Sequence, residues 1–280
     1  MKRQNTVNTK DIFMMKNMSK LLSNGSSNAK TKKNQRPTKI LYLHPSKIEG
    51  KEMCPFASEG CRMSCLNTAG RGAMQSVQDA RIRRTKQYVL NRDAFYNQLY
   101  KEIQSFSRYY VNKGKEVAIR LNGTSDQPLV ETMFHQVRRF NYNIVFYDYT
   151  KNYKKAGTRY GIDGNRYVVA FSYSEKEGSE SQALDVLEGG GLVAIVFDEL
   201  PKTWHGYRVV NGDERDDLMV DIEGPAILGL VAKGKAKHDT SGFVVKKTDE
   251  HMNVPEPVIV SRSEDMFWNE MAVYQERFAD

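Results

Sequence analysis

The segment KILYLHPSKIEGKEMCPFASEGCRMSC, residues 39–65, joins a short apolar run to all three cysteines of the chain. Lys39–His44 (KILYLH) has the length and apolar character of a buried strand, and Pro45 and Gly50 mark the loop that follows it. The cysteines come after this strand, on the loop. Because parallel α/β sheets carry their sites on the loops that follow the strands, the segment bears on both fold and function.

Outside this segment, apolar runs of strand length alternate with stretches of helical composition. The further strands expected are 117–121, 143–149, 167–172, 192–197 and 226–231, and the helices expected are 73–89, 93–111, 130–140 and 179–187. This alternation predicts an α/β fold with a parallel sheet, here a partial or irregular TIM-like barrel. One β-hairpin is predicted as an insertion, with Tyr207–Val210 and Leu218–Asp221 flanking Asn211-Gly212.

The positive charge of the chain is concentrated near its N-terminus. The net charge is +8, yet residues 1–39 hold ten Lys or Arg residues and one Asp, which leaves the rest close to neutral. Ser23–Pro37 has the polar composition of a segment that cannot fold alone. We therefore predict a disordered, basic, flexible tail over residues 1–37 and an α/β barrel-like domain, which carries the three cysteines, over residues 38–280. Two interpretations of the tail stay open: it binds nucleic acid or another acidic partner, or it is a solvated extension.

Two features of the sequence concern the compartment. No stretch reaches the roughly 18–20 uninterrupted apolar residues that span a bilayer. The N-terminus also lacks the charged, apolar and small-residue pattern of a secretory signal. These observations predict a cytoplasmic protein with no membrane partner, in which thiols stay reduced. In such a compartment, clustered cysteines indicate metal binding rather than disulfides.

Cys54, Cys61 and Cys65 form a C-x6-C-x3-C pattern. Thiolates are soft ligands that suit iron–sulfur clusters and zinc, and Gly60 gives the loop freedom to turn its sulfurs toward one centre. The pattern favours a [4Fe–4S] cluster in which one iron has no cysteine ligand. Two alternatives stay open: zinc completed by His44, although the C-x2-C pairs of structural zinc sites are absent from the sequence, and a cysteine loop that binds no metal.

Polar side chains follow the expected strands at their carboxyl ends, where parallel sheets place their active sites. The candidate substrate or cofactor rim consists of Asn122, Ser125, Asp126, Asp148, Lys151, Ser172 and Lys233. The candidates for the fourth iron ligand are His44, Asp126 and Asp148. Because loop residues are generally hydrophilic, polarity alone does not mark these residues as functional. Their shared position at one edge of the sheet makes them candidates.

A three-cysteine loop after the first strand of an α/β chain resembles the radical S-adenosylmethionine (radical SAM) superfamily. The resemblance implies that three cysteines bind three irons and that the fourth iron binds S-adenosylmethionine (SAM). The chain is also similar to an uncharacterised bacteriophage three-cysteine protein family, which brings no settled reaction. The segments that carry this similarity are Cys54-Pro-Phe, Gly60-Cys61, Cys65-Leu66, Ala69-Gly70-Arg71-Gly72, Arg120–Asp126, Tyr147–Lys151, Lys233–Ala236 and Asp239–Phe243.

Two function classes follow from these features. In the first, the protein is an iron–sulfur enzyme of radical SAM-like build that acts on an unknown small-molecule substrate at the rim. In the second, it is a non-catalytic iron–sulfur or zinc protein that binds nucleic acid or a host partner in an infected cell. An enzyme needs a pocket at the strand ends beside the cluster, whereas a binding protein can fill that space with side chains.

Overall fold

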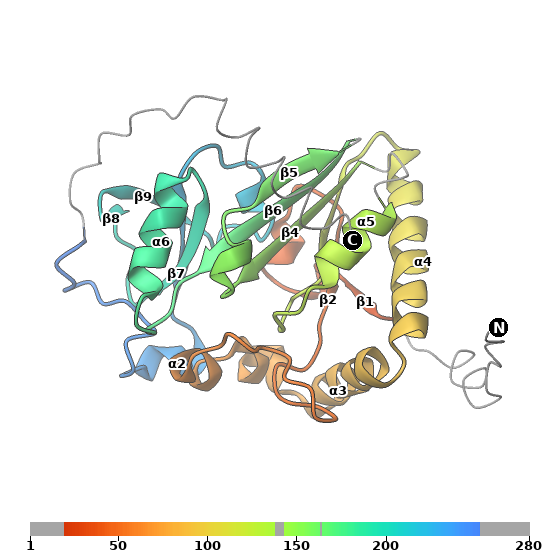
Figure 1. Ribbon diagram of the computed structural model, residues 1–280, viewed down its shortest axis with the longest axis horizontal. Coiled ribbons are helices and arrows are strands. Elements are labelled where there is room, and N and C mark those ends of the chain that lie inside the picture. The colour runs from red at the N-terminus through yellow and green to blue at the C-terminus, as the bar shows by residue number, and fades with distance from the viewer. Residues whose placement is uncertain (1–19, 138–142, 163, 253–280) are drawn as a thin grey trace, which may run out of the picture.

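A mostly parallel sheet organises the residues that the computed structural model describes, which are 20–137, 143–162 and 164–252 (Figure 1). Its strands are β1 (Leu22–Asn24), β2 (Thr38–Leu41), β3 (Val117–Arg120), β4 (Ile144–Thr150), β5 (Arg159–Ile162), β6 (Asn165–Ser172), β7 (Leu192–Phe197), β8 (Thr203–Trp204), β9 (Tyr207–Asn211) and β10 (Ala226–Val231). Neighbouring strands follow the order β1-β2-β3-β4-β6-β7-β10-β9-β8, and β5 pairs with β6 outside this path. Pairing is parallel from β2 through to β9 in this order, while β1, β5 and β8 pair antiparallel.

Helices cover the faces of the sheet and one of its edges. The α-helices are α2 (Glu59–Met63), α3 (Gln75–Leu90), α4 (Arg92–Val111), α5 (Leu129–Val137) and α6 (Ser179–Glu188). The short 3-10 helices are η1 (Gly25–Ser27), η2 (Thr31–Lys33), η3 (Leu66–Thr68), η4 (Gly70–Ala73), η5 (Tyr153–Lys155), η6 (Leu218–Val220) and η7 (Gly234–His238). Figure 1 shows α2 and α3 along the edge toward which the parallel strands run. Among the described helices, none combines the length and the apolar character that a membrane span requires.

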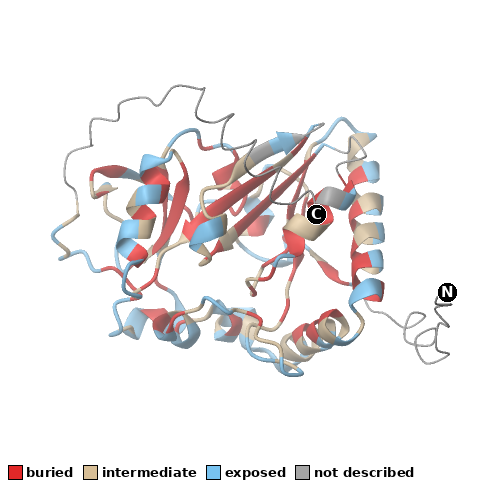
Figure 2. Cartoon of the chain, viewed as in Figure 1, coloured by how far each residue is buried: buried red, intermediate tan, exposed pale blue. Residues whose placement is uncertain are grey.

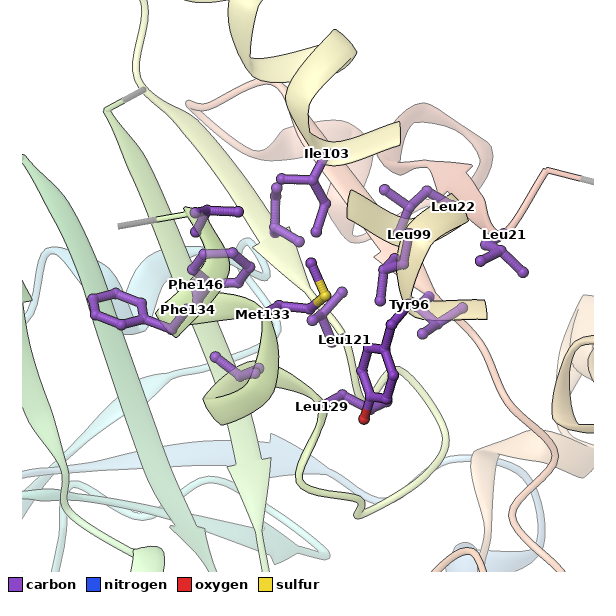
Figure 3. Packing of buried hydrophobic residues seen from close by; sticks show 14 of the residues in the cluster. Leu21, Leu22, Tyr96, Leu99, Ile103, Leu121, Leu129, Met133, Phe134 and Phe146 are labelled. Carbon is purple, nitrogen blue, oxygen red and sulfur yellow. The ribbon is translucent and has the colours of Figure 1, made fainter. Parts of the chain in front are cut away.

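The sheet is buried on both faces. On one face, residues of α4 and α5 such as Leu99 and Met133 pack against Phe146 of β4 (Figure 3). Val145 and Tyr147, the neighbours of Phe146 in the chain, belong to the cluster on the opposite face, as the two-residue period of a strand requires. Figure 2 shows that the central strands are buried along most of their length. This two-sided burial explains why the strands appear in the sequence as continuous apolar runs.

The α/β prediction is confirmed, including the parallel sheet. Leu192–Phe197 and Ala226–Val231 have the predicted bounds as β7 and β10, and the other predicted strands and helices lie within a few residues of their expected positions. In the described part of the chain, β1 and β8 are the end strands and do not pair with each other. Closure into a TIM-like barrel therefore stays a prediction.

The predicted hairpin insertion is wrong in its pairing. Tyr207–Val210 lies in β9, but its antiparallel partner is β8, with Trp204 opposite Tyr207. Leu218–Asp221 forms η6 and its C-cap instead. A turn does begin at Asn211, where the Glu214 N–H donates to the Asn211 carbonyl at 3.2 Å, but it leads to no antiparallel partner for β9, and the Gly212 N–H donates to the Gly229 carbonyl of β10 at 2.8 Å.

The predicted flexible tail, residues 1–37, extends too far. Leu22–Asn24 pairs with β2 as β1, and Leu21 and Leu22 are buried in the main core. Arg36 forms ion pairs with carboxylates that lie about 80 or more positions further along the chain, those of Glu116, Asp217 and Asp221. A composition argument misses these contacts because the partners come from distant parts of the sequence. Residues 1–19 lie outside the described residues.

Candidate metal centre

The three cysteines lie on the segment that crosses the carboxyl edge of the sheet between β2 and α3 (Figure 1). Cys54 precedes α2, Cys61 lies within α2, and Cys65 is the residue before η3. All three are partly buried free thiols. The segment contacts loops that follow β3, β6 and β10, so strands that are far apart in the sequence position it jointly.

Glu175, which follows β6, fixes the start of α2. Its carboxylate accepts hydrogen bonds from the Ser58 hydroxyl and from the Gly60 backbone N–H, each at 2.7 Å. The Ser58 hydroxyl in turn caps α2 by accepting from the Cys61 N–H at 3.1 Å. These acceptors satisfy amide groups that a helix leaves free in its first turn. Glu175, on the loop that follows β6, thereby holds Cys61 in place.

Close packing places α2 against the loop that follows β10. A Cβ atom on Gly60 would collide with the Ser241 hydroxyl and would lie 2.7 Å from Phe243 Cβ, so the contact requires glycine. Cys61 packs against the small apolar cluster that includes Ala236 and Phe243. Helix α2, which contains Cys61, is therefore held between the loops that follow β6 and β10.

Cys54 is tied to the loop that follows β3. The Asp126 N–H donates to the Met53 carbonyl at 2.9 Å, and the Gln127 side-chain amide donates to the same carbonyl at 3.0 Å. The Cys54 sulfur lies 3.8 Å from the Thr124 carbonyl oxygen. The two hydrogen bonds to Met53 fix the backbone next to Cys54.

Cys65 lies beside the buried guanidinium group of Arg81 in α3. The Cys65 sulfur accepts from the Asn67 N–H at 3.5 Å, and the Asn67 side chain accepts a hydrogen bond from Arg81. The guanidinium carbon lies 5.3 Å from the centre of the Tyr42 ring. Burial lowers the pKa of Arg81, while the nearby Tyr42 and Cys65 groups raise it in part. The Arg81 Nε atom is buried and has no hydrogen-bond partner among the described residues.

The cysteine sulfurs influence one another but are not gathered as tightly as around a single ion. Burial raises the pKa of Cys54, and Asp126 and the other two thiols add to the rise. Burial likewise raises the pKa of Cys61, against the opposing effect of Lys151. Among the described residues, the three sulfurs do not form a group within 4.8 Å of one another. Thiolates bound to one tetrahedral zinc at about 2.3 Å lie roughly 3.8 Å apart, so the present spacing is wider than such a site needs.

Three predicted rim residues, Asp126, Lys151 and Ser172, come together beside the cysteines. The Lys151 ammonium group donates to the Ser172 hydroxyl at 3.0 Å and to its carbonyl at 3.1 Å. The Asp126 carboxylate accepts from the Lys151 backbone N–H at 3.0 Å. Burial lowers the pKa of Lys151, and among the charges that raise it the thiol of Cys61 contributes most. Lys151 thus places a partly buried cation close to Cys61.

Asn122, Ser125 and Asp148 are engaged with one another in a buried network. The Asp148 carboxylate accepts from the Asn122 N–H at 3.0 Å and from the Asn122 side-chain amide at 2.9 Å. The Asn122 side-chain oxygen accepts from the Ser125 hydroxyl at 2.9 Å. Burial raises the pKa of Asp148 to about 7, although Arg120 and the hydrogen bonds oppose the rise. These three residues stabilise the ends of β3 and β4.

The remaining predicted residues, His44 and Lys233, lie at the border of the site. The His44 N–H donates to the Thr85 hydroxyl at 2.8 Å. Burial lowers the pKa of His44, and the nearby charge of Arg81 lowers it further. Lys233 is half exposed, and its ammonium group lies 2.6 Å from the Asp213 carboxylate.

Sequence reasoning does not find Glu175, Ser58 and Asn67, although they hold the cysteine segment in place. Ser58 offers a weak signal, since a serine before an acidic residue is a common helix N-cap. No local pattern connects Glu175 with Gly60, because 115 positions separate them. Only the packing of β6 beside the cysteine segment brings the two residues together.

A comparison with protein families matches residues 16–247 to the family described as gene product 88. The chain belongs to the gene product 88 family. This match supports the phage-type lineage predicted from the sequence, whereas membership of the radical SAM superfamily stays a prediction. The gene product 88 match begins within the predicted tail, in agreement with the packing of β1 on β2. No curated protein and no solved structure matches the chain.

Proposed function

We propose that Cys54, Cys61 and Cys65 bind a [4Fe–4S] cluster at the carboxyl edge of the sheet. The observation that carries the proposal is that three free thiols of one segment lie at this edge, where the loop after β3 holds the backbone at Cys54 and the loop after β6 holds that at Cys61. The Arg81 Nε atom, which is buried and has no hydrogen-bond partner in the part of the chain that the structure describes, also fits, because buried donors are normally satisfied and a cluster sulfide accepts hydrogen bonds.

The spacing of the thiols supports the cluster over zinc. A single zinc ion would require the three sulfurs to lie closer together than they do, whereas a four-iron cluster binds each thiolate at a different iron. His44, the fourth ligand that a zinc site would need, is half-buried next to Arg81. The positive charge of Arg81 next to His44 disfavours the binding of a zinc ion by His44.

The residues around the thiols have defined parts in this proposal. Glu175 orients Cys61 through the start of α2, and the Asp126–Met53 hydrogen bond holds the backbone next to Cys54. Lys151 and Arg81 offset the negative charge of the thiolates. When bound, such a cluster transfers electrons and leaves one iron without a cysteine ligand.

We further propose that the protein is an enzyme of radical SAM-like build whose substrate binds at this edge. Asp126 and Asp148 accept hydrogen bonds on both of their carboxylate oxygens, which favours a fourth iron that is open to a small molecule. SAM is the candidate ligand by resemblance, and a mostly parallel sheet is compatible with the partial barrel of that superfamily. The C-x6-C-x3-C pattern differs from the superfamily's usual C-x3-C-x2-C.

A second candidate is a non-catalytic cluster protein that binds a host partner or nucleic acid. Large apolar side chains of the cysteine segment are exposed: Phe56 by 41%, Met63 by 64%, Leu66 by 61% and Met74 by 53%. Exposed apolar residues that lie together mark interaction surfaces more often than isolated ones do. In this alternative the cluster is a structural or redox element beside the bound partner.

Anaerobic purification followed by iron and acid-labile sulfide analysis tests the cluster. We expect about four irons and four sulfides per chain, and loss of both when any one of the three cysteines is changed to alanine. Met63→Ala is the matched control, because Met63 is an exposed residue of the same short helix. Stoichiometric zinc without sulfide, or a full cluster in all three cysteine variants, would overturn the proposal.

A further inference from the structure

Glu180, His205 and His251 form a second cluster of metal-ligand side chains, which shares no residue with the cysteine centre. Glu180 lies in the first turn of α6, His205 in the turn between β8 and β9, and His251 in the segment that follows Val245. Their ligand atoms all lie within 4.8 Å of one another. Within the described ranges, no other group of three His, Cys, Asp or Glu residues reaches this spacing.

The backbone holds His205 in an uncommon conformation. β8 and β9 are joined by the two residues His205 and Gly206, whose φ angles are +49° and +79°. Positive φ at both positions defines a type I′ turn, in which Asn-Gly is the favoured pair. Histidine is enriched with asparagine and aspartate among the non-glycine residues at positive φ, so the turn accommodates His205 and fixes the backbone from which its imidazole reaches Glu180.

The distances fit one ion between the three side chains. The Glu180 Oε1 atom lies 2.9 Å from His205 Nε2 and 3.7 Å from His251 Nε2. Ligands bound to tetrahedral zinc at about 2.0–2.2 Å are roughly 3.4 Å apart, and the two distances bracket this value. The His205 Nε2 atom is also buried without a partner that meets hydrogen-bond geometry in the described part of the chain.

We propose that Glu180, His205 and His251 bind a divalent metal ion of the zinc type. Two imidazoles and one carboxylate are a ligand set that such ions take, with the fourth position left to water. That position faces solvent, since the side chain of Glu180 is 47% exposed and that of His251 is 36% exposed. The imidazole rings of His205 and His251 are stacked with their centres 3.8 Å apart. For the nitrogen lone pairs of both rings to point at one ion, at least one ring must rotate about χ2.

The ion joins three elements that already pack on one another, since Trp204 of β8, Ala183 of α6 and Met252 contribute to one apolar cluster. The His205 N–H donates to the His251 carbonyl at 2.9 Å, and Trp204 forms an isolated bridge with Met252. Binding of the ion adds a side-chain connection from this segment to α6 through Glu180. The site is therefore a structural clip that holds the segment around His251 against the β8–β9 hairpin and α6.

Cobalt(II) and zinc titrations of the chelator-treated, full-length protein test this site. We expect cobalt to give visible d–d absorption without sulfur-to-cobalt charge transfer in the near ultraviolet, and zinc to displace it. Zinc at about a hundredfold over Kd should raise the melting temperature by roughly 5 °C or more. His205→Asn, which suits the type I′ turn, and His251→Gln should each weaken binding by at least about 100-fold, since even residues that only support metal ligands matter 10–100-fold.

His238→Asn is the matched control, because His238 is an exposed histidine of η7 outside the cluster. It should bind cobalt and zinc as the unchanged protein does. Cobalt d–d absorption that is the same in His205→Asn as in the unchanged protein, equal zinc affinity in that variant, or a melting temperature that does not respond to zinc would each overturn the proposal. The cysteine cluster is measured separately by its sulfide content, so failure of one site does not decide the other.

Discussion

At the scale of single residues, Glu175 controls the position of Cys61. Both of its carboxylate oxygens accept hydrogen bonds at the start of α2. We expect Glu175→Gln to lower the iron content and to destabilise the fold by about 1–3 kcal/mol, because the amide NH2 group turns one acceptor into a donor facing a donor. Iron analysis and urea unfolding measure the two effects. Glu177→Gln, at an exposed position of the same loop, should match the unchanged protein, and an equal iron content in both variants would contradict the role of Glu175.

Arg81 offers a test of charge beside the cluster. Its guanidinium is buried next to Cys65 with one unpartnered donor. We expect Arg81→Gln to lower the reduction potential of the cluster by roughly tens of millivolts, because a removed cation no longer favours the more negative reduced state. Arg83→Gln changes an exposed arginine of the same helix and should leave the potential unchanged. Redox titration followed by electron paramagnetic resonance compares the two, and identical potentials would remove Arg81 from the site.

Asp216 gives a pH-dependent contribution to stability. Burial alone would raise the pKa of Asp216, but Arg120 and Lys30, each at 3.2 Å, outweigh it and lower the pKa to about 2. Because this folded-state pKa lies below the ordinary value of 3.8, the stabilisation is complete above about pH 4 and is lost as the pH falls toward 2. We expect Asp216→Asn to destabilise the protein by about 3–5 kcal/mol at pH 7, since it removes a fully buried carboxylate that pairs with the partly buried cations of Lys30 and Arg120.

Urea unfolding of Asp216→Asn at several pH values checks this window. The difference from the unchanged protein should shrink between pH 4 and pH 2. Glu199→Gln breaks the exposed ion pair with Lys247, in which both side chains are more than 60% exposed, and should cost less than about 1 kcal/mol at any pH. A constant deficit of Asp216→Asn across the pH range would show that lost packing, rather than charge, causes the effect.

At the scale of elements, the segment from Lys20 to Pro37 belongs to the folded body. A chain that begins at Thr38 loses β1, with the two buried leucines worth about 1.5–3 kcal/mol each, and it leaves Asp216 without Lys30. The sum approaches the roughly 5–15 kcal/mol of a typical domain, so we expect this chain not to fold stably. A chain that begins at Lys20 keeps every described contact and should melt cooperatively. Circular dichroism during heating compares the two, and equal melting curves would show that β1 is dispensable.

The elements that the sequence predicts well are those with strong apolar patterns of their own. β7 and β10 are buried on both faces and have the expected bounds, and α3 and α4 differ from the expected helices by one or two residues. The missed strands β1, β5 and β8 are two to four residues long and pair antiparallel at the borders of the sheet. Strands this short have no readable alternation, because the partner strand rather than the local sequence selects them.

At the scale of the whole molecule, part of the basic charge is used inside the fold. Lys30 and Arg36 pair with the acidic loop at Asp216 and Asp217 and with Glu116, which come from later elements. In the sequence these charges lie in two distant segments, one basic and one acidic. In the folded protein the two segments pair and neutralise each other. The positive charge available to nucleic acid is therefore smaller than the sequence alone implies, and binding by residues 1–19 stays a prediction.

Some residues of the candidate site can be predicted from the local sequence, whereas others depend on contacts between distant parts of the chain. The cysteine spacing and the position of Asp126, Lys151 and Ser172 after strands are readable in the sequence, because parallel strands end at one edge. The roles of Glu175 and Arg81 are not readable, since each acts across a contact that only packing creates. Residues that bind a centre can thus be predicted from their own chemistry, while residues that orient them require the fold.

The ligand of the fourth iron distinguishes an enzyme from a binding protein. With three cysteines in the chain and both oxygens of Asp126 and of Asp148 engaged, the remaining position is expected to be open to small molecules. Cyanide, a small iron ligand, should then alter the electron paramagnetic resonance spectrum of the reduced protein. SAM should alter it less, because the segment that grips the amino group of SAM in the radical SAM superfamily is not evident in this sequence.

Three outcomes of these additions separate the proposals. A SAM-dependent spectral change with release of 5′-deoxyadenosine, both lost in the cysteine variants, would establish radical SAM chemistry against our expectation of a weak response. A change with cyanide alone would keep an open iron and an enzyme of another class. If neither molecule changes the spectrum, a protein group closes the fourth position, and His44 becomes the first residue to test, because it ends the first apolar run and adjoins the Arg81 guanidinium beside Cys65. His44→Ala should then make the spectrum respond to cyanide, and a closed site of this kind would favour the non-catalytic alternative.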